Sequence, residues 1–145
     1  MRNILFICTA NYYRSRFSEA VFNHLANRRG LEWRAFSRGL IPEEAPDGLS
    51  PHAANGLKLV GVSPEFFPSV KKALALEDFE QADRIFALKK DEHLPMLEER
   101  FPENLSRVEF WDVSDIPHVS PAQAMLQIKE NIEALLVELE DEAAG

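Results

Sequence analysis

The sequence predicts one α/β domain built on an open parallel sheet. Short apolar runs typical of strands alternate along the chain with longer segments of helical periodicity. Strands that are separated by helices form parallel βαβ units. The 145 residues are most simply one domain, residues 1–145, because they contain no internal repeat and no linker-like segment.

The first half of the chain alternates in this way. Residues 3–8 form an unbroken apolar run, which predicts a buried strand, and residues 15–29 place apolar side chains at helical spacing. Gly30 is expected to end that helix. Residues 33–37 alternate and predict a second strand, and the polar, proline-containing residues 41–50 predict a loop.

The second half repeats the pattern. Pro51 favours the start of a helix that runs to about residue 60, and residues 66–70 are either a short strand or a turn. A long amphipathic helix capped by Ser120 is expected to close the fold. The elements predicted between residues 70 and 145 are helices at 76–82, 92–100 and 121–140 and strands at 84–88 and 108–111.

The most informative motif lies where the first predicted strand meets the first predicted helix. The apolar run ends at Cys8, five residues separate Cys8 from Arg14, and Ser15 opens the helix. A loop of this length can turn its backbone N–H groups inward and form an anion site at the helix N-terminus. In an open α/β sheet, ligands bind at this carboxyl end of the strands.

The residue types in this motif suit covalent phosphoryl transfer. Arg14 carries a planar fork of donors that matches two oxygens of an oxyanion. A helix N-terminus and a neighbouring cation stabilise the thiolate form of a cysteine such as Cys8. A lone cysteine is more often a small core residue and an early helical arginine a solvated one. The position of the motif between strand and helix favours the catalytic interpretation.

Composition excludes several other classes of protein. The formal net charge of −8 argues against nucleic acid and anionic membranes as partners. No apolar run approaches the length of a membrane span, and the N-terminus does not resemble a signal peptide. A single cysteine excludes an internal disulfide and suits a cytoplasmic location. No metal or other cofactor is expected, because His24, His52, His93 and His118 lack ligand spacing.

The chain resembles the low-molecular-weight protein tyrosine phosphatase family, whose relatives include thioredoxin-coupled arsenate reductases. The resemblance implies an open four-stranded parallel sheet flanked by helices on both faces, with a phosphate loop after the first strand. It also implies a cysteinyl-phosphate intermediate and, as substrate, a phosphorylated protein or a small phosphomonoester. The matching segments, in order, are 4–8, Asn11, 14–15, 18–20, 37–39, 77–79, 83–85 and 111–115.

The resemblance also assigns roles to single residues. The general acid is expected at Asp115, with Asp112 as the alternative, because Ile116 interrupts the Asp-Pro pair of the family. Ser37 and Ser69 are expected to support the loop, and Ser15 to cap the helix and donate to the sulfur of Cys8. The residues expected to bind phosphate are Thr9, Ala10, Asn11, Tyr12, Tyr13, Arg14 and Ser15.

This sequence departs from the family at the cleft. Tyr13 stands where many members carry a second cysteine, so a disulfide within the loop is impossible. Glu43 or Glu44 lies near a place where aromatic residues usually flank the cleft. Tyr12 and Tyr13 either rebuild a wall of the cleft or pack against the first helix.

Two alternatives to a phosphatase remain open at this point. An arsenate reductase would attack arsenate with Cys8 and need an external thiol, because the chain has no second cysteine. An oxyanion-binding regulatory protein with decayed catalysis is the other alternative, suggested by the displaced proline and the missing aromatic residues of the cleft.

Overall fold

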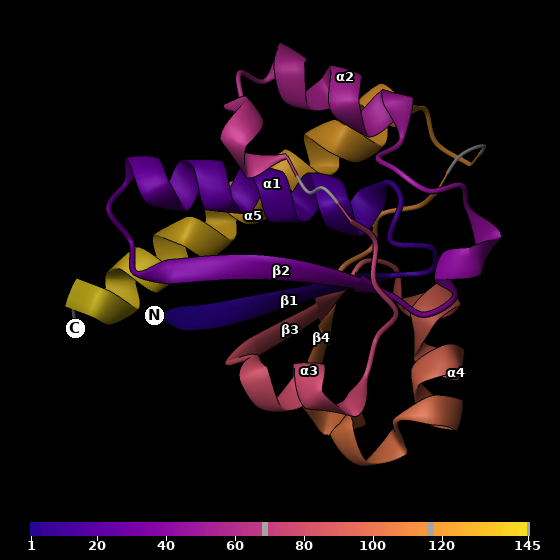
Figure 1. Cartoon of the computed structure of the whole chain (residues 1–145). Coiled ribbons are helices and arrows are strands. Elements are labelled where there is room, and N and C mark those ends of the chain that lie inside the picture. The colour runs from indigo at the N-terminus through magenta and orange to yellow at the C-terminus, as the bar shows by residue number, and fades with distance from the viewer. Residues whose placement is uncertain (68–69, 116–117, 145) are drawn as a thin grey trace.

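Four parallel strands form the centre of the molecule (Figure 1). The computed structural model describes residues 1–67, 70–115 and 118–144. The strands are β1 (Arg2–Cys8), β2 (Trp33–Gly39), β3 (Arg84–Ala87) and β4 (Val108–Phe110), in the order β2-β1-β3-β4. The predicted open, four-stranded parallel sheet is therefore confirmed.

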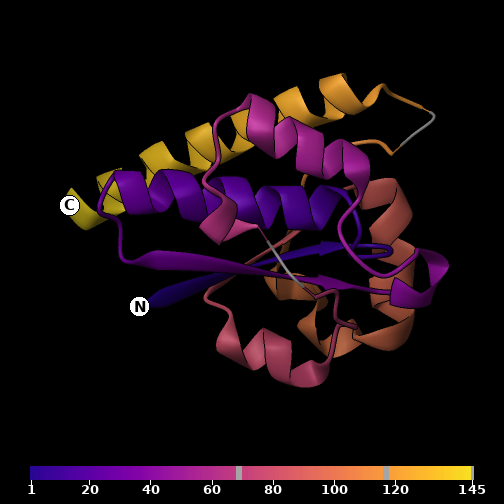
Figure 2. The ribbon, with the colours of Figure 1, turned by 45° about the horizontal axis from the view of Figure 1, so that its top comes forward.

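Helices cover both faces of this sheet, as Figures 1 and 2 show. On one face lie α1 (Arg14–Arg28) and α5 (Pro121–Ala144), with α2 (Pro51–Leu59) packed against both. On the other face lie α3 (Leu76–Gln81) and α4 (Lys90–Arg100). Short 3₁₀ helices occupy Pro42–Glu44, Pro64–Phe66 and Pro102–Arg107.

The core lies in two layers because side chains alternate along β1. Ile4 and Phe6 point into the layer beneath α1 and α5, and Leu5 and Ile7 point into the layer beneath α3 and α4. All four of these side chains are fully buried. The unbroken apolar run of β1 is thus explained by burial on both faces of the sheet.

Most element boundaries agree with the sequence prediction within a few residues. Gly30 follows α1 with a φ of +68°, the left-handed conformation that ends many helices. Ser120 Oγ accepts a hydrogen bond from the backbone N–H of Gln123, as expected of a capping residue. The segment 66–70 begins at the end of a 3₁₀ turn, and residues 68–69 lie outside the described part.

The chain order places β1 at the point where the winding of the sheet reverses. The chain leaves β1 to form β2 on one side and later returns to form β3 on the other side. The loop after Cys8 therefore opens into the crevice between two diverging connections. Within the described residues, no helix has the length and apolar character needed to cross a bilayer.

Candidate active site

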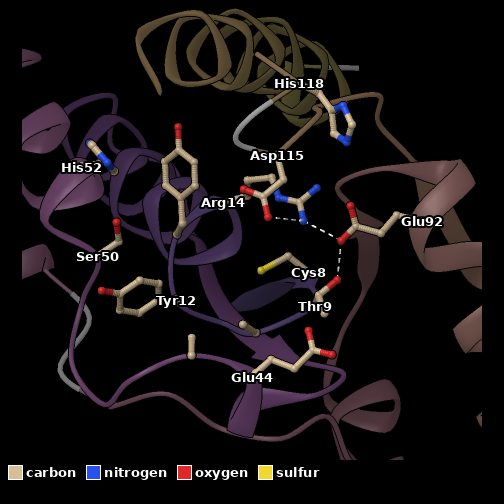
Figure 3. A pocket seen from close by; sticks show the side chains of 13 residues that line it. Cys8, Thr9, Tyr12, Arg14, Glu44, Ser50, His52, Glu92, Asp115 and His118 are labelled. Carbon is tan, nitrogen blue, oxygen red and sulfur yellow. Dashed lines mark hydrogen bonds and ion pairs between the residues drawn. The ribbon is translucent and has the colours of Figure 1, made fainter. Parts of the chain in front are cut away.

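A cavity of about 450 Å³ lies at the carboxyl end of β1 (Figure 3). It combines the loop after β1 with the segments that follow β2, β3 and β4. The lining residues are Cys8, Thr9, Ala10, Tyr12, Tyr13, Arg14, Glu44, Ala45, Ser50, His52, Glu92, Asp115 and His118. The structure thus brings together the Cys8, Arg14 and Asp115 predicted from separate parts of the sequence.

Asn11 sets the shape of the loop. Its φ of 51° is the only positive value of a described non-glycine residue, and asparagine tolerates this left-handed conformation. The loop also lies against the end of β2, where a Cβ on Gly39 would approach the backbone N of Asn11 to 2.8 Å. Glycine at position 39 therefore permits the close approach of β2 to the loop.

A hydrogen-bond network fixes Asn11 from three sides. Its Nδ2 donates to Ser15 Oγ at 2.9 Å and to Ser37 Oγ at 3.0 Å, and its Oδ1 accepts from the backbone N–H of Lys72 at 2.9 Å. Ser37 Oγ in turn donates to Glu19 Oε1 at 2.7 Å. Burial is the main cause that raises the pKa of Glu19, although Ser37 stabilises the carboxylate.

The hydrogen bond from Asn11 leaves the Ser15 proton available to Cys8. Because Ser15 Oγ accepts from Asn11, its single proton remains for Cys8 Sγ, 2.9 Å away. A hydroxyl donor at this distance stabilises negative charge on the sulfur. The expectation that Ser15 also caps α1 is wrong: the helix begins at Arg14, its N-cap is Tyr13, and no described side chain caps it.

Arg14 is a buried cation, with 2% of its surface exposed. Its Nη1 donates to the carbonyl of Val113 at 3.0 Å, and its Nη2 donates to Glu92 Oε2 at 2.6 Å. A longer contact of 3.5 Å joins Nη2 to Asp115 Oδ2. Burial opposes the charge of Arg14, but the hydrogen bond to Glu92 and the charges of Cys8 and Asp115 outweigh it and raise its pKa.

The two aspartates after β4 lie in different surroundings. Asp115 lines the cavity close to Arg14, as Figure 3 shows. Asp112 is not among the lining residues; its side chain is 78% exposed and pairs with Lys89. Residues 116–117, which include the displaced proline, lie outside the described part.

The two tyrosines of the loop divide between the two expected arrangements. Tyr12 lines the cavity as a wall residue. Tyr13 is 6% exposed and belongs to the core cluster, although it also contacts the cavity. Its hydroxyl donates to the carbonyl of Pro121 at 3.1 Å. Burial, together with the charge of Asp115, raises the pKa of Tyr13 to about 12.

The opposite wall comes from the segment 41–50, which carries Glu44. Two cations hold this segment by its carbonyl groups: fully buried Arg16 donates to Gly48 O at 2.6 Å, and Lys71 Nζ donates to Pro42 O at 2.7 Å. The backbone N–H of Ser50 also donates to Tyr12 O at 3.1 Å. The wall is thereby attached to the loop and to α1.

Supporting residues, some expected and some not, complete the site. Ser37 lies in the Asn11 network, whereas Ser69 lies outside the described residues.

Glu92 and His93 of α4 contact the loop and were not predicted as site residues. The signal that could have found them is their position just after β3, because all parallel strands end at the same edge of the sheet.

Comparison with known proteins gives one family and several relatives. The family described as low molecular weight phosphotyrosine protein phosphatase matches residues 3–143. A Bacillus subtilis (strain 168) protein named protein-arginine-phosphatase is 34% identical over 89 residues, which cover 59% of this chain and 55% of that protein. The match therefore spans about half the length of this relative.

Solved structures resemble the chain over nearly its whole length. A low molecular weight protein tyrosine phosphatase from T. tengcongensis has 25% identity and a TM-score of 0.80, with 95% of this chain and 99% of that chain covered. YfkJ from Bacillus subtilis has 25% identity and a TM-score of 0.83, with 98% and 96% covered.

Proposed function

Because this chain belongs to the low molecular weight phosphotyrosine protein phosphatase family, we propose that it hydrolyses phosphomonoesters through a phosphocysteine at Cys8. The observation that carries the proposal is the arrangement around the sulfur. Cys8 Sγ lies 2.9 Å from the hydroxyl of Ser15, which can donate to it, in the same cavity as the buried guanidinium of Arg14. These groups supply a stabilised nucleophile and a site for the oxyanion.

The first chemical step transfers the phosphoryl group to the enzyme. The thiolate of Cys8 attacks phosphorus, an S–P bond forms, and the P–O ester bond breaks with its electron pair on the departing oxygen. Asp115, in its protonated form, gives its proton to that oxygen. Arg14 and the backbone N–H groups of the loop stabilise the charge on the remaining phosphoryl oxygens.

The second step releases phosphate. A water oxygen attacks phosphorus while the carboxylate of Asp115 accepts a proton from this water. The S–P bond breaks, and its electron pair returns to the sulfur of Cys8. The hydrogen bond from Ser15 stabilises the thiolate that leaves. Neither step requires a redox co-reactant.

The proposed substrate is a phosphorylated tyrosine on a protein, as the family description suggests. A second candidate is phosphorylated arginine, which the name of the Bacillus subtilis relative suggests. In this substrate the P–N bond would break in place of the P–O bond, and Asp115 would protonate the departing guanidino nitrogen. The lining of the cavity supports this candidate, because Glu44, Glu92 and Asp115 accompany one arginine, Arg14, among the described lining residues. A phosphorylated guanidino group carries positive character beside the phosphate, which nearby carboxylates favour. A cytoplasmic location is also proposed, because the chain has one cysteine.

A direct assay tests the proposed function. Purified protein should release phosphate from an aryl phosphate and from a phosphotyrosine or phosphoarginine peptide, and Cys8→Ser should abolish release. The ratio of kcat/KM for the two peptides identifies the preferred substrate. Phosphate binding without turnover of any of the three would instead support a decayed, oxyanion-binding protein. Turnover of arsenate with an external thiol alone would support a reductase.

A further inference from the structure

Glu92 contacts Arg14 from a distant part of the chain. Arg14 opens α1, whereas Glu92 lies in the first turn of α4, 78 residues later. Glu92 Oε2 lies 2.6 Å from Arg14 Nη2, and Figure 3 shows the carboxylate beside the guanidinium at the edge of the cavity. A carboxylate at this position repels the phosphate that the site is proposed to bind.

The carboxylate is itself held in place by two further residues. Thr9 Oγ1 donates a short hydrogen bond to Glu92 Oε2, and His93 Nε2 lies 3.1 Å from the same oxygen. Burial would raise the pKa of Glu92, but the hydrogen bonds from His93, Arg14 and Thr9 outweigh it and hold this pKa well below its ordinary value. Glu92 is therefore an anchored anion and not a mobile surface side chain.

His93 contributes as a neutral donor. The side chain is fully buried, and burial is the main cause that lowers its pKa. Its Nδ1 accepts a hydrogen bond from the backbone N–H of Lys89 at 3.0 Å. The single proton of the neutral ring is consequently on Nε2, which faces Thr9 Oγ1 at 3.2 Å as well as Glu92. This one proton is shared between Glu92 Oε2 and Thr9 Oγ1, and the Thr9 hydroxyl donates its own proton to Glu92.

We propose that Glu92, anchored by Thr9 and His93, is a positioning residue that fixes the guanidinium of Arg14 for the oxyanion. This inference rests on the proposed hydrolysis at Cys8. Glu92 holds Nη2 and the carbonyl of Val113 holds Nη1, so the plane of the guanidinium is set from both ends. An arginine has five N–H donors, and those not used here remain for phosphoryl oxygens. Fixing a catalytic group before substrate binds lowers the ordering cost of the transition state.

The proposal predicts a change in phosphate affinity opposite to the one that charge repulsion alone would cause. Glu92→Gln should weaken binding of inorganic phosphate, although it removes a negative charge beside the site. It should also lower kcat/KM by up to about 10²-fold, as expected when a catalytic group is misplaced. The loss should be equal for aryl phosphates with good and with poor leaving groups, because Arg14 contacts the transferred phosphoryl group and not the leaving oxygen.

The matched control is Asp91→Asn. Asp91 is exposed, lies next to Glu92 in α4 and carries the same charge, but it is not a lining residue of the cavity. Its removal should leave phosphate affinity and kcat nearly unchanged. Thr9→Val, which lacks the hydroxyl that holds Glu92, should reproduce the loss, and Thr9→Ser should recover most of it.

Titration calorimetry with inorganic phosphate and steady-state kinetics decide the outcome. If Glu92→Gln binds phosphate as tightly as the wild type or more tightly and keeps its kcat, the positioning role is wrong. If the wild type releases phosphate from neither a phosphate ester nor a phosphoarginine peptide, the proposed function fails, but the phosphate affinities still test the positioning of Arg14. If Glu92→Gln does not fold, as judged by circular dichroism, the Thr9→Val and Thr9→Ser pair gives the result.

Discussion

Ser15 Oγ lies 2.9 Å from Cys8 Sγ and accepts a hydrogen bond from the amide of Asn11, so its own proton is available to the sulfur. The hydroxyl of Ser15 is thus placed at the floor of the cavity where it can donate to the sulfur. The orientation begins outside the cavity, where Ser37 donates its own proton to Glu19 and so accepts from Asn11. The site depends on this buried chain of side chains as much as on the residues that line it.

Ser15→Ala should slow catalysis by removing the hydroxyl donor to the sulfur. We expect kcat to fall by about 10- to 100-fold, the range of a lost hydrogen bond to a charged group of about 1.5–3 kcal/mol. Alkylation of Cys8 by iodoacetamide should slow as well, because the sulfur loses the hydroxyl that stabilises its negative charge. The control is Ser18→Ala, another buried serine of α1, whose hydroxyl donates to Arg14 O and not to Cys8. Equal alkylation rates in wild type and Ser15→Ala would contradict the role of Ser15.

Asp115→Asn should lower kcat by about 10² to 10⁴-fold, as is usual for a positioned proton donor. The loss should be smaller for substrates with good leaving groups, because their departing oxygen needs less protonation. Asp112→Asn is the control, since Asp112 pairs with Lys89 outside the cavity. Kinetics with a series of aryl phosphates measure both. If Asp112→Asn shows the dependence on leaving group and Asp115→Asn does not, the acid is assigned to the wrong aspartate.

Much of the fold could be predicted from local patterns. The apolar run of β1 and the helical spacing of α1 are properties of neighbouring residues, and they identify the strand, the loop and the helix that carry Cys8 and Arg14. The same is true of Gly30, whose left-handed conformation ends the helix. The alternation of strands and helices was enough to predict a parallel sheet.

Contacts across the fold could not be read from those patterns. In the sequence, Glu92 and His93 resemble the polar residues at the solvent-exposed start of a helix. They reach the loop because β3, which ends shortly before them, lies beside β1. The complete burial of Arg16 likewise results from the path of the segment 41–50 over α1, which no local periodicity describes. Site residues such as Glu92 can be identified by their position just after a parallel strand. Their spacing from Cys8 and Arg14 along the chain does not reveal them.

Glu92 should make the folding stability depend on pH. Its folded pKa lies below the ordinary value of about 4.3 for glutamate, so its contribution is complete above that pH and is lost as pH falls toward the folded pKa. The difference in free energy of unfolding between wild type and Glu92→Gln should therefore be largest above about pH 5 and shrink in stronger acid. Urea titrations across this range measure it, with Asp91→Asn as control. A difference that grows on acidification would show that the sign is wrong.

Peroxide should inactivate the protein in two stages. A thiolate at Cys8 is oxidised first to a sulfenic acid, and the chain has no second cysteine to trap it as a disulfide. Recovery by dithiothreitol should therefore fall with longer exposure, and bound phosphate should slow the loss by shielding the sulfur. Mass spectrometry should find sulfinic or sulfonic acid at Cys8. Full recovery after long exposure, with no overoxidised Cys8, would argue against an accessible thiolate.

The central claim is the covalent phosphocysteine, and mass spectrometry of an acid-quenched reaction tests it most directly. Wild type mixed with an aryl phosphate and quenched during turnover should carry one phosphoryl group on the peptide that contains Cys8. With substrates for which the attack of water limits turnover, Asp115→Asn should accumulate more phosphocysteine than the wild type, because the base for this attack is missing. Cys8→Ser should release no phosphate in steady state. Continued hydrolysis by Cys8→Ser, or turnover by the wild type with no phosphoryl group on Cys8 at any quench time, would contradict the mechanism.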